Sequence, residues 1–384
     1  MRVIGLISGT SFDAIEAAAV DFELAGDLLE ARVVATSSTP YAPDLRRRIA
    51  AALPPARTTL EEVCALDTLV GQAFAGAAAA LELDPPADLA CSHGQTVFHW
   101  VEGTRALGTL QLGQAAWIAE QLGIPVVSDV RIRDIAAGGQ GAPLASVLDV
   151  LLLGASERTC AALNLGGIAN VTVIRPGEEP LAYDTGPANA LLDLAMTRDG
   201  GGETFDRDGA RARRGRVDED VLERLLSEPY YALAPPKTTG KELFHADYLS
   251  DVELPLEDLL ATLAALTVET VAAELERWGV ERVVVSGGGT RNPAIMEGLR
   301  ARLLDVDFAL FDELGVPAEA KEAVVFALIG YLTARGLPGT VPSCTGAGRA
   351  AVLGTITPGT GPLVLPEPAA TAPRRLVLRV GAAA

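Results

Sequence analysis

Three turns of small residues come directly after apolar runs, at residues 8–11 (Ser-Gly-Thr-Ser), 166–170 (Gly-Gly-Ile-Ala-Asn) and 286–289 (Ser-Gly-Gly-Gly). Because glycine has no Cβ, the backbone N–H groups of such turns can approach a phosphate, and concave rows of amides bind anions even without a lysine. A fourth motif, residues 184–187 (Asp-Thr-Gly-Pro), lies between the second and third turns. This order predicts a nucleotide held between two halves of the chain, with phosphoryl transfer as the chemistry.

The glycine turns also have a plainer interpretation, because glycine mostly serves tight turns. The first two turns open the two halves at equivalent places, which favours contacts with the β- and γ-phosphates over two unrelated turns. The third turn ends a β-branched run and precedes a helix expected from Pro293. Open α/β sheets bind ligands where a strand ends and a helix begins, so this turn predicts an adenosine or phosphate contact.

Asp184 ends an apolar run and is followed by a turn that contains Gly186 and Pro187. A carboxylate at such a place can act as a general base or hold a magnesium-bound water. The alternative is that Asp184 caps the helix expected from residue 188, since aspartate is a common N-cap residue. Thr185 is the more natural cap, so we favour catalysis for Asp184.

Two of the three histidines, His93 and His99, follow an expected strand at residues 89–92. A metal site would need a third ligand, and none is evident from the spacing. Hydrogen bonding to a polyol or an amide is therefore the preferred role, with a structural role almost equally open for His99.

Arg131 and Arg133 follow another expected strand, beside Asp134. Two guanidinium groups can receive a carboxylate or a phosphate, although alone they are equally typical of a solvated loop. Lys321 and Glu322, at the start of the last long helix, have the same two interpretations.

The composition is that of a soluble globular protein with two domains, because 384 residues exceed one ordinary core and 49% of them are hydrophobic. The formal charge of −19 argues against nucleic-acid or membrane partners, which need a basic surface. An anionic nucleotide must then be met locally, by amides, a few arginines and a divalent cation. Four scattered cysteines indicate reduced thiols in a cytoplasmic protein, not a zinc site or a disulfide framework. The short N-terminal apolar run predicts neither a secretory signal nor a membrane span.

The two halves of the chain show the same order of elements, three strands followed by alternating helix and strand, which predicts a duplicated fold. We expect one domain at residues 1–140, a second at 155–340, a crossover at 141–154 with a hinge near its glycines, and a partly irregular C-terminal segment at 341–384. The expected strands are 3–7, 17–22, 31–37, 89–92, 124–128, 160–165, 171–174, 181–184, 282–286, 307–310 and 375–380. The expected helices are 44–53, 60–83, 112–122, 188–198, 255–278, 293–304 and 318–334.

Taken together, the motifs resemble those of the anhydro-N-acetylmuramic acid kinase family, within the sugar kinase, Hsp70 and actin superfamily. The matching stretches run from Gly5 to about Gly354. They are 8–13, 92–97 with His99, 110–113, 124–127 with Asp129 and Arg131, 138–143, 164–170, 184–187 with Asn189, 205–209, Lys237 with Thr239, Gly240 and Phe244, 287–289 with Asn292, and 321–323 with Phe326.

The resemblance implies a duplicated actin-like (ribonuclease H-like) α/β fold of two domains with a central cleft. It implies an ATP- and Mg²⁺-dependent kinase of cell-wall recycling, which opens the 1,6-anhydro ring of anhydro-N-acetylmuramic acid with water and phosphorylates O6. By the family pattern Asp184 is the general base that activates the water. The expected ATP contacts are Gly9, Thr10, Ser11, Asp13, Gly166, Gly167, Asn170, Gly287, Gly288, Gly289 and Asn292. The expected sugar contacts are His93, Gln95, Arg131, Asp134 and Glu322. The metal ligands are not assigned from the sequence, and Asp13, through a water, is the one candidate for magnesium.

The chain departs from the family pattern at three positions: Ala14 and Ala188 stand where glycine is usual, and Glu16 where aspartate is usual. Ala14 would disfavour a positive φ in the first loop. Two other functions remain open on the sequence, a kinase of a different anhydrosugar and a nucleotide-binding regulatory protein without turnover. The apolar helices make a homodimer plausible, but no motif fixes it.

Overall fold

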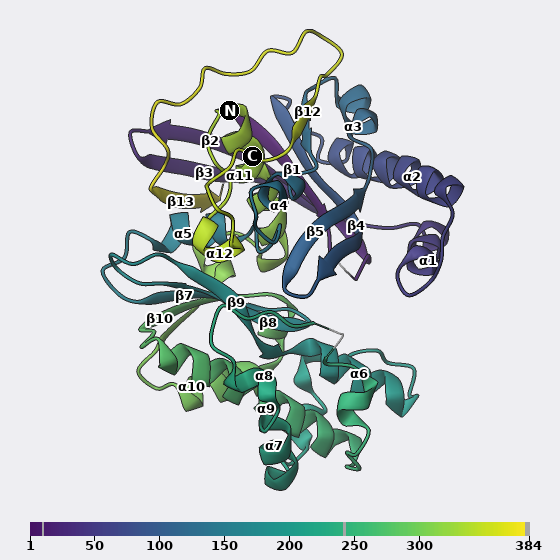
Figure 1. Cartoon of the computed structure of the whole chain (residues 1–384), viewed down its shortest axis with the longest axis vertical. Helices are drawn as coiled ribbons and strands as arrows, with labels where there is room; N and C mark the ends of the chain where they lie inside the picture. Colours follow the sequence, from purple (N-terminus) through teal and green to yellow (C-terminus); the bar gives the residue numbers. More distant parts are fainter. Residues whose placement is uncertain (10, 241–242, 381–384) are drawn as a thin grey trace. The chain divides into compact units, whose positions relative to one another are not determined.

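The computed structural model describes residues 1–9, 11–240 and 243–380, and Thr10 of the first turn therefore lies outside the described residues. The chain divides into two compact units (Figure 1). Unit 1 comprises Met1–Ala155 with Leu314–Ala384, and unit 2 comprises Ser156–Glu313. Each unit has its own sheet and its own hydrophobic core.

The sheet of unit 1 has the order β12-β6-β4-β1-β2-β3-β13, with β5 paired to β4. Strands β1, β2 and β3 form an antiparallel meander, and β4 and then β6 continue the sheet in parallel with β1. The strands are β1 (Arg2–Ser8), β2 (Ala14–Ala25), β3 (Leu28–Pro40), β4 (Leu89–Glu102), β5 (Arg105–Leu112), β6 (Val126–Ser128), β12 (Thr355–Thr357) and β13 (Arg375–Val380).

Helices cover both faces of this sheet, and alternation along β1 decides which side chain meets which helix. Ile4 and Leu6 belong to the core cluster that α2 builds with Phe74. On the other face, a Cβ at Gly5 would lie 1.9 Å from the carbonyl oxygen of Ala323, so β1 and α11 approach closely only because residue 5 is glycine. The helices of unit 1 are α1 (Pro43–Ala52), α2 (Leu60–Ala79), α3 (Ala115–Leu122), α4 (Ile132–Ala136), α5 (Ser146–Leu153), α11 (Lys321–Ala334) and α12 (Pro342–Thr345).

The sheet of unit 2 has the order β11-β10-β7-β8-β9. Its core lies between this sheet and α9, whose inner residues Leu260, Leu263 and Val271 are buried against the strands. The elements are β7 (Cys160–Leu165), β8 (Ile168–Ile174), β9 (Leu181–Pro187), β10 (Arg282–Ser286), β11 (Asp307–Leu310), α6 (Asn189–Asp199), α7 (Glu219–Leu226), α8 (Pro229–Ala232), α9 (Leu256–Arg277) and α10 (Pro293–Arg302).

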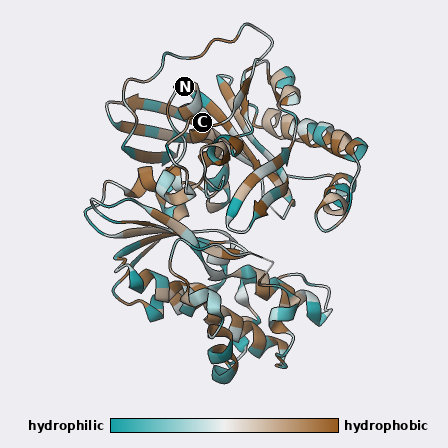
Figure 2. Ribbon diagram, in the orientation of Figure 1, coloured by the Kyte–Doolittle hydropathy of each residue, from teal (hydrophilic) through white to brown (hydrophobic). Residues whose placement is uncertain are grey.

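The two sheets repeat one topology, which confirms the predicted duplicated actin-like fold. In unit 2, β7, β8 and β9 form the antiparallel meander, and β10 and β11 extend the sheet in parallel with β7. This is the pattern of β1, β2 and β3 with β4 and β6. Figure 2 shows apolar residues along the strands of both sheets. Within the described residues, no helix combines the length and hydropathy that a membrane span requires.

The structural units differ from the predicted domain boundaries at the C-terminal side. Residues 314–340, expected in the second domain, belong to unit 1, because α11 packs on β1, β2 and β4. Residues 141–154, expected as a crossover with a hinge, also belong to unit 1, where α5 contacts α11 and β13. A buried ion pair between Lys321 and Asp149 (2.8 Å) ties α5 to α11.

Most expected elements are present, the bounds differ most at β4 and β5, and helices α4, α7, α8 and α12 were not expected. The expected strand at 89–92 extends to Glu102, and the helix expected from 112 begins only at Ala115, because residues 105–112 form β5 and pair with β4 as a hairpin. The strand expected at 375–380 is β13, which runs parallel to β3. The short β12 was not expected.

Candidate functional site

Asp184 lies at a β-bulge near the end of β9. On β8, Ala169 faces Gly186 while Asn170 faces Asp184, so Thr185 is the extra residue of the bulge. Bulges re-aim side chains and are enriched beside active sites. The Thr185 hydroxyl donates to the carbonyl oxygen of Ala169 (3.3 Å), which holds the bulge.

The Asp184 carboxylate is half-buried and receives two hydrogen bonds at one oxygen. The Thr238 hydroxyl and the Thr239 N–H both donate to Oδ2, each over 2.9 Å. Helix α6 begins at Asn189 with Ala188 as N-cap and no side-chain cap. The N-cap interpretation is therefore wrong for both Asp184 and Thr185, and the carboxylate is held by a different part of the chain.

The glycines of unit 2 fall into two groups according to what a side chain would meet. A Cβ at Gly287 (φ 90°) would lie 2.6 Å from Asn164 Oδ1, and one at Gly289 would lie 2.7 Å from Leu165 Cβ. These two glycines are explained by the fold. At Gly167 and Gly288 the nearest atoms lie 3.8 and 4.0 Å away and no positive φ occurs, so a Cβ would fit there in ordinary van der Waals contact. We call such positions open glycines, because the fold does not require glycine at them.

Three further residues that were expected to contact the nucleotide lie in unit 2, where the structure shows their local contacts. Asn292 is buried and its amide oxygen accepts from Ala294 N–H (3.0 Å), so it is the N-cap of α10. Gly166 lies in the turn between β7 and β8, and its carbonyl oxygen accepts from the Asn189 side chain (2.8 Å). Asn170 is half-buried on β8, directly opposite Asp184.

In unit 1 the first turn follows β1. A Cβ at Gly9 would meet no described atom within 4 Å, so Gly9 belongs with the open glycines. Ser11 and Asp13 are exposed, and Asp13 forms an ion pair with Arg46. The positive φ of this loop falls on Phe12 (43°), whereas Ala14 already begins β2. The departure at Ala14 therefore does not disturb the loop.

A buried polar cluster joins the middle of β4 to the segment that follows β6. Arg131 donates from Nε to His93 Nε2 (2.7 Å) and from a terminal nitrogen to Gly141 O (2.7 Å), while His93 Nδ1 contacts Gly94 O (2.9 Å). Since Arg131 is always a donor, His93 carries its proton on Nδ1 and accepts at Nε2. Gln95, also buried, donates to Gly9 O (3.2 Å) and so links this cluster to the first turn.

Asp134 and Glu322 supply the acidic part of the cluster. Asp134 is buried and accepts from Thr345 Oγ1 and Gly141 N–H, each over 2.8 Å. Burial raises the pKa of Glu322, and the charge of Arg131 opposes that rise. Among the described residues Arg131 makes no ion pair with Glu322 within 4.0 Å, so the two side chains sense each other's charge without contact.

Electrostatics at the first turn involve the unusual Glu16. Burial raises the pKa of Glu16, the hydrogen bond from Ser38 opposes this, and the negative charge of Glu322 adds to the rise. Burial also takes the pKa of His93 well below its usual value, with a further lowering by Arg131. His93 is thus a neutral acceptor, which fits its hydrogen bond to Arg131.

Several residues that hold the candidate base were not assigned roles from the sequence: Tyr230, Lys237, Thr238, Thr239 and Glu274. They come from loops and a helix far from residue 184, so no local spacing connects them. The only signal was the presence of Lys237 and Thr239 among the motifs of the resemblance.

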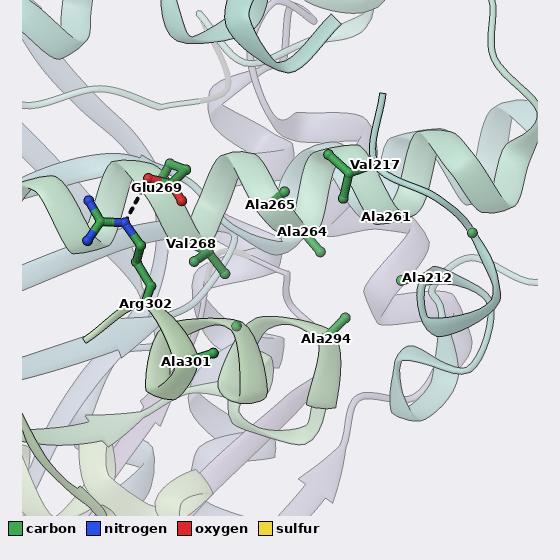
Figure 3. A pocket seen from close by; sticks show the side chains of 12 residues that line it. Ala212, Val217, Ala261, Ala264, Ala265, Val268, Glu269, Ala294, Ala301 and Arg302 are labelled. Atoms are coloured by element: carbon green, nitrogen blue, oxygen red, sulfur yellow. Dashed lines mark hydrogen bonds and ion pairs between the residues drawn. The ribbon is translucent and has the colours of Figure 1, made fainter. Parts of the chain in front are cut away.

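A groove of about 470 Å³ lies elsewhere on unit 2, between α9 and α10 (Figure 3). Its walls are mostly alanine and valine, and an ion pair between Arg302 and Glu269 (3.2 Å) crosses one end. None of the expected site residues lines this groove. It is therefore not the predicted nucleotide or sugar site.

The open glycines of the two units and the side chains that could ligate a metal can be compared. A Cβ would overlap no described atom at Gly9, Gly167 or Gly288, and its absence leaves the backbone there accessible to a phosphate. Among the described side chains, no group of three or more His, Cys, Asp and Glu residues is arranged to hold a metal ion. All four cysteines are free thiols.

Comparisons with known proteins agree on one family. A family model described as anhydro-N-acetylmuramic acid kinase matches residues 1–359. Proteins of that name are 57% identical in Streptomyces coelicolor (99% of each chain), 53% in Rhodococcus erythropolis (94% of each chain) and 43% in Gloeobacter violaceus (92% of this chain and 98% of the relative). The chain belongs to the anhydro-N-acetylmuramic acid kinase family.

Proposed function

We propose that this protein is an ATP-dependent kinase that opens the 1,6-anhydro ring of 1,6-anhydro-N-acetylmuramic acid and phosphorylates O6. The product is N-acetylmuramic acid 6-phosphate, and the reaction belongs to cell-wall recycling. One observation carries the proposal beyond family membership: the Asp184 carboxylate is held at a bulge, half-buried and fixed by donors on a single oxygen.

In this mechanism Asp184 accepts a proton from a water molecule as the water oxygen attacks the anomeric carbon. The bond between C1 and O6 breaks, and O6 takes the γ-phosphoryl group of ATP while ADP leaves. Two hydrogen bonds to Oδ2 fix the carboxylate plane, which reduces the cost of orienting the base before reaction.

The open glycines are the proposed nucleotide contacts. The fold does not require glycine at residues 9, 167 and 288. A phosphate bound close to the backbone would require it, because a Cβ would block its approach. Ser11, Asp13, Gly166 and Asn170 stand next to these glycines and complete the proposed set. Magnesium, when bound with the nucleotide, neutralises phosphate charge, and Asp13 is the proposed side chain that holds it through a water.

The cluster of unit 1 is the proposed sugar site. The second terminal nitrogen of Arg131 makes no hydrogen bond to a described residue and suits the lactyl carboxylate of the muramic sugar, while Glu322 can accept from a hydroxyl or amide. His93 and Asp134 act on the sugar indirectly in this scheme, because their polar atoms are engaged by Arg131, Thr345 and Gly141. We also propose a cytoplasmic site of action, and size-exclusion chromatography tests the expected homodimer.

The first test compares wild type with Asp184→Asn in a coupled assay for ADP release with the anhydromuramic sugar. We expect kcat to fall by roughly a hundredfold or more while nucleotide affinity is kept, as is usual for loss of a general base. Near-full turnover by this variant would remove Asp184 from the mechanism. A higher kcat/KM for an anhydroglucose without lactyl and acetamido groups would overturn the substrate assignment.

A further inference from the structure

Residues 237–239 contact both the backbone and the carboxylate of Asp184, and we call them the 237–239 segment. The Asp184 N–H donates to the carbonyl oxygen of Lys237 (3.0 Å), in addition to the two hydrogen bonds that Oδ2 receives from Thr238 and Thr239. Strand β9 is the last strand of its sheet, so this segment pairs with its outer edge. The orientation of the candidate base therefore depends on where the 237–239 segment lies.

The segment is anchored by the side chain of Lys237, which is only 2% exposed. Its Nζ donates to Glu274 Oε1 (2.8 Å) and to the carbonyl oxygen of Tyr231 (3.1 Å). The ring of Tyr230 lies 5.1 Å from the ammonium group, and the Tyr230 hydroxyl donates to the backbone oxygen of Asp184 (2.7 Å). A buried charge is tolerated only where it has such partners, so these contacts fix the position of the Lys237 side chain.

Glu274, on α9, uses its other oxygen to hold the strand that carries Asp184. The Tyr183 hydroxyl donates to Glu274 Oε2 (3.0 Å), and Arg277 pairs with the same oxygen (2.9 Å). Tyr183 immediately precedes Asp184, as Lys237 immediately precedes Thr238. The buried Glu274 carboxylate thus holds both Tyr183, which precedes the candidate base, and Lys237, which precedes the donor Thr238.

We propose that Glu274 is a positioning residue for the reaction, which acts through Lys237 and Tyr183 to keep the Asp184 carboxylate in one orientation. The inference rests on the proposed role of Asp184. Breaking a buried ion pair costs stability in any protein, so a loss of stability alone does not support positioning. The distinguishing effect is a loss of kcat without a loss of substrate affinity.

The test uses the full-length enzyme with Glu274→Gln, Thr238→Val and Thr238→Ser. Glu276→Gln is the matched control, because Glu276 lies on the same helix at an exposed pair with Arg302. We expect Thr238→Val to lower kcat by about tenfold to a hundredfold, the value of one hydrogen bond to a charged group, with KM for ATP and sugar within about twofold of wild type. Thr238→Ser, which keeps the hydroxyl, restores kcat. Glu274→Gln lowers kcat at least as much as Thr238→Val, and Glu276→Gln leaves kcat unchanged.

Four results separate this proposal from its alternatives. In an Asp184→Asn background, adding Glu274→Gln lowers kcat no further if Glu274 acts through the base, and an independent further loss overturns the proposal. Wild-type kcat in folded Glu274→Gln also overturns it. If that variant does not fold, full kcat in Thr238→Val overturns it instead. Turnover retained by Asp184→Asn alone refutes the proposed function, whatever Glu274→Gln does.

Discussion

Gly288 and Gly289 are neighbours in sequence, yet we expect opposite effects when each is replaced by alanine. At Gly288 the nearest atom to a new Cβ lies 4.0 Å away, and no positive φ strains the residue. Gly288→Ala should therefore raise the free energy of unfolding by about 0.4–1 kcal/mol, since alanine has less freedom in the unfolded chain. At Gly289 the Cβ would lie 2.7 Å from Leu165 Cβ and 3.0 Å from Leu165 O. This overlap should lower the free energy of unfolding by about 1–3 kcal/mol.

Gly288→Ala, although expected to be the more stable variant, should bind the nucleotide more weakly than wild type. A methyl group at Gly288 would stand where the phosphate is proposed to approach, and loss of one hydrogen bond to a charged group costs about 1.5–3 kcal/mol. The Kd for a non-hydrolysable ATP analogue should thus rise about tenfold to a hundredfold in Gly288→Ala. Urea denaturation measures the stability and calorimetric titration the affinity. Wild-type affinity in Gly288→Ala refutes the proposed phosphate contact, and reduced stability refutes the claim that the space is open.

Three further predictions concern unit 1. Arg131→Lys should raise KM for the sugar about tenfold, because lysine has no planar group that can donate to His93 and to a carboxylate at once. Steady-state kinetics measure KM, with the exposed Arg133→Lys as control. Equal KM values in the two variants would contradict this prediction. Glu16→Gln should stabilise the protein most at neutral pH. The pKa of Glu16 in the folded state is raised above 4.5, so the wild type loses stability as the pH rises from 4.5 through that raised value. Denaturation curves from pH 4.5 to 8 should therefore show that the stability difference between variant and wild type grows with pH. Lys321→Met should lower the free energy of unfolding by roughly 3–5 kcal/mol, because it removes the ammonium group that pairs with the buried carboxylate of Asp149. A change below about 1 kcal/mol in urea denaturation would contradict this.

The sequence predicted the strands of both meanders and the repeated order of elements, because buried strands rich in valine, isoleucine and alanine differ clearly from polar turns. It did not predict that α11 belongs to unit 1. Beyond its first turn this helix is almost entirely apolar, so its sequence does not indicate which sheet it covers. The close approach at Gly5 that fixes its place is a contact across more than 300 residues. The hairpin of β4 and β5 was missed because its outer residues, such as Trp100, are exposed and lack a buried face.

For the site, the sequence pointed to Asp184 and to the glycine turns, but it could not distinguish glycines that the fold requires from those it leaves open. Gly287 and Gly288 are equivalent in the sequence, whereas only Gly287 has a positive φ and a blocked Cβ. The partners of Asp184 could not be predicted either, because Thr238 and Thr239 lie more than 50 residues away in the sequence and meet Asp184 only in the tertiary structure.

Unit 1 is assembled from both ends of the chain, and this has a consequence for how the protein emerges from the ribosome. Helix α11 is buried along nearly its whole length against β1, β2 and β4, yet it is translated after all of unit 2. The N-terminal sheet must therefore wait, with one apolar face uncovered, while more than 150 further residues are synthesised. Unit 2 is continuous and can complete its core during that interval. Vectorial synthesis thus favours completion of the second unit before the first.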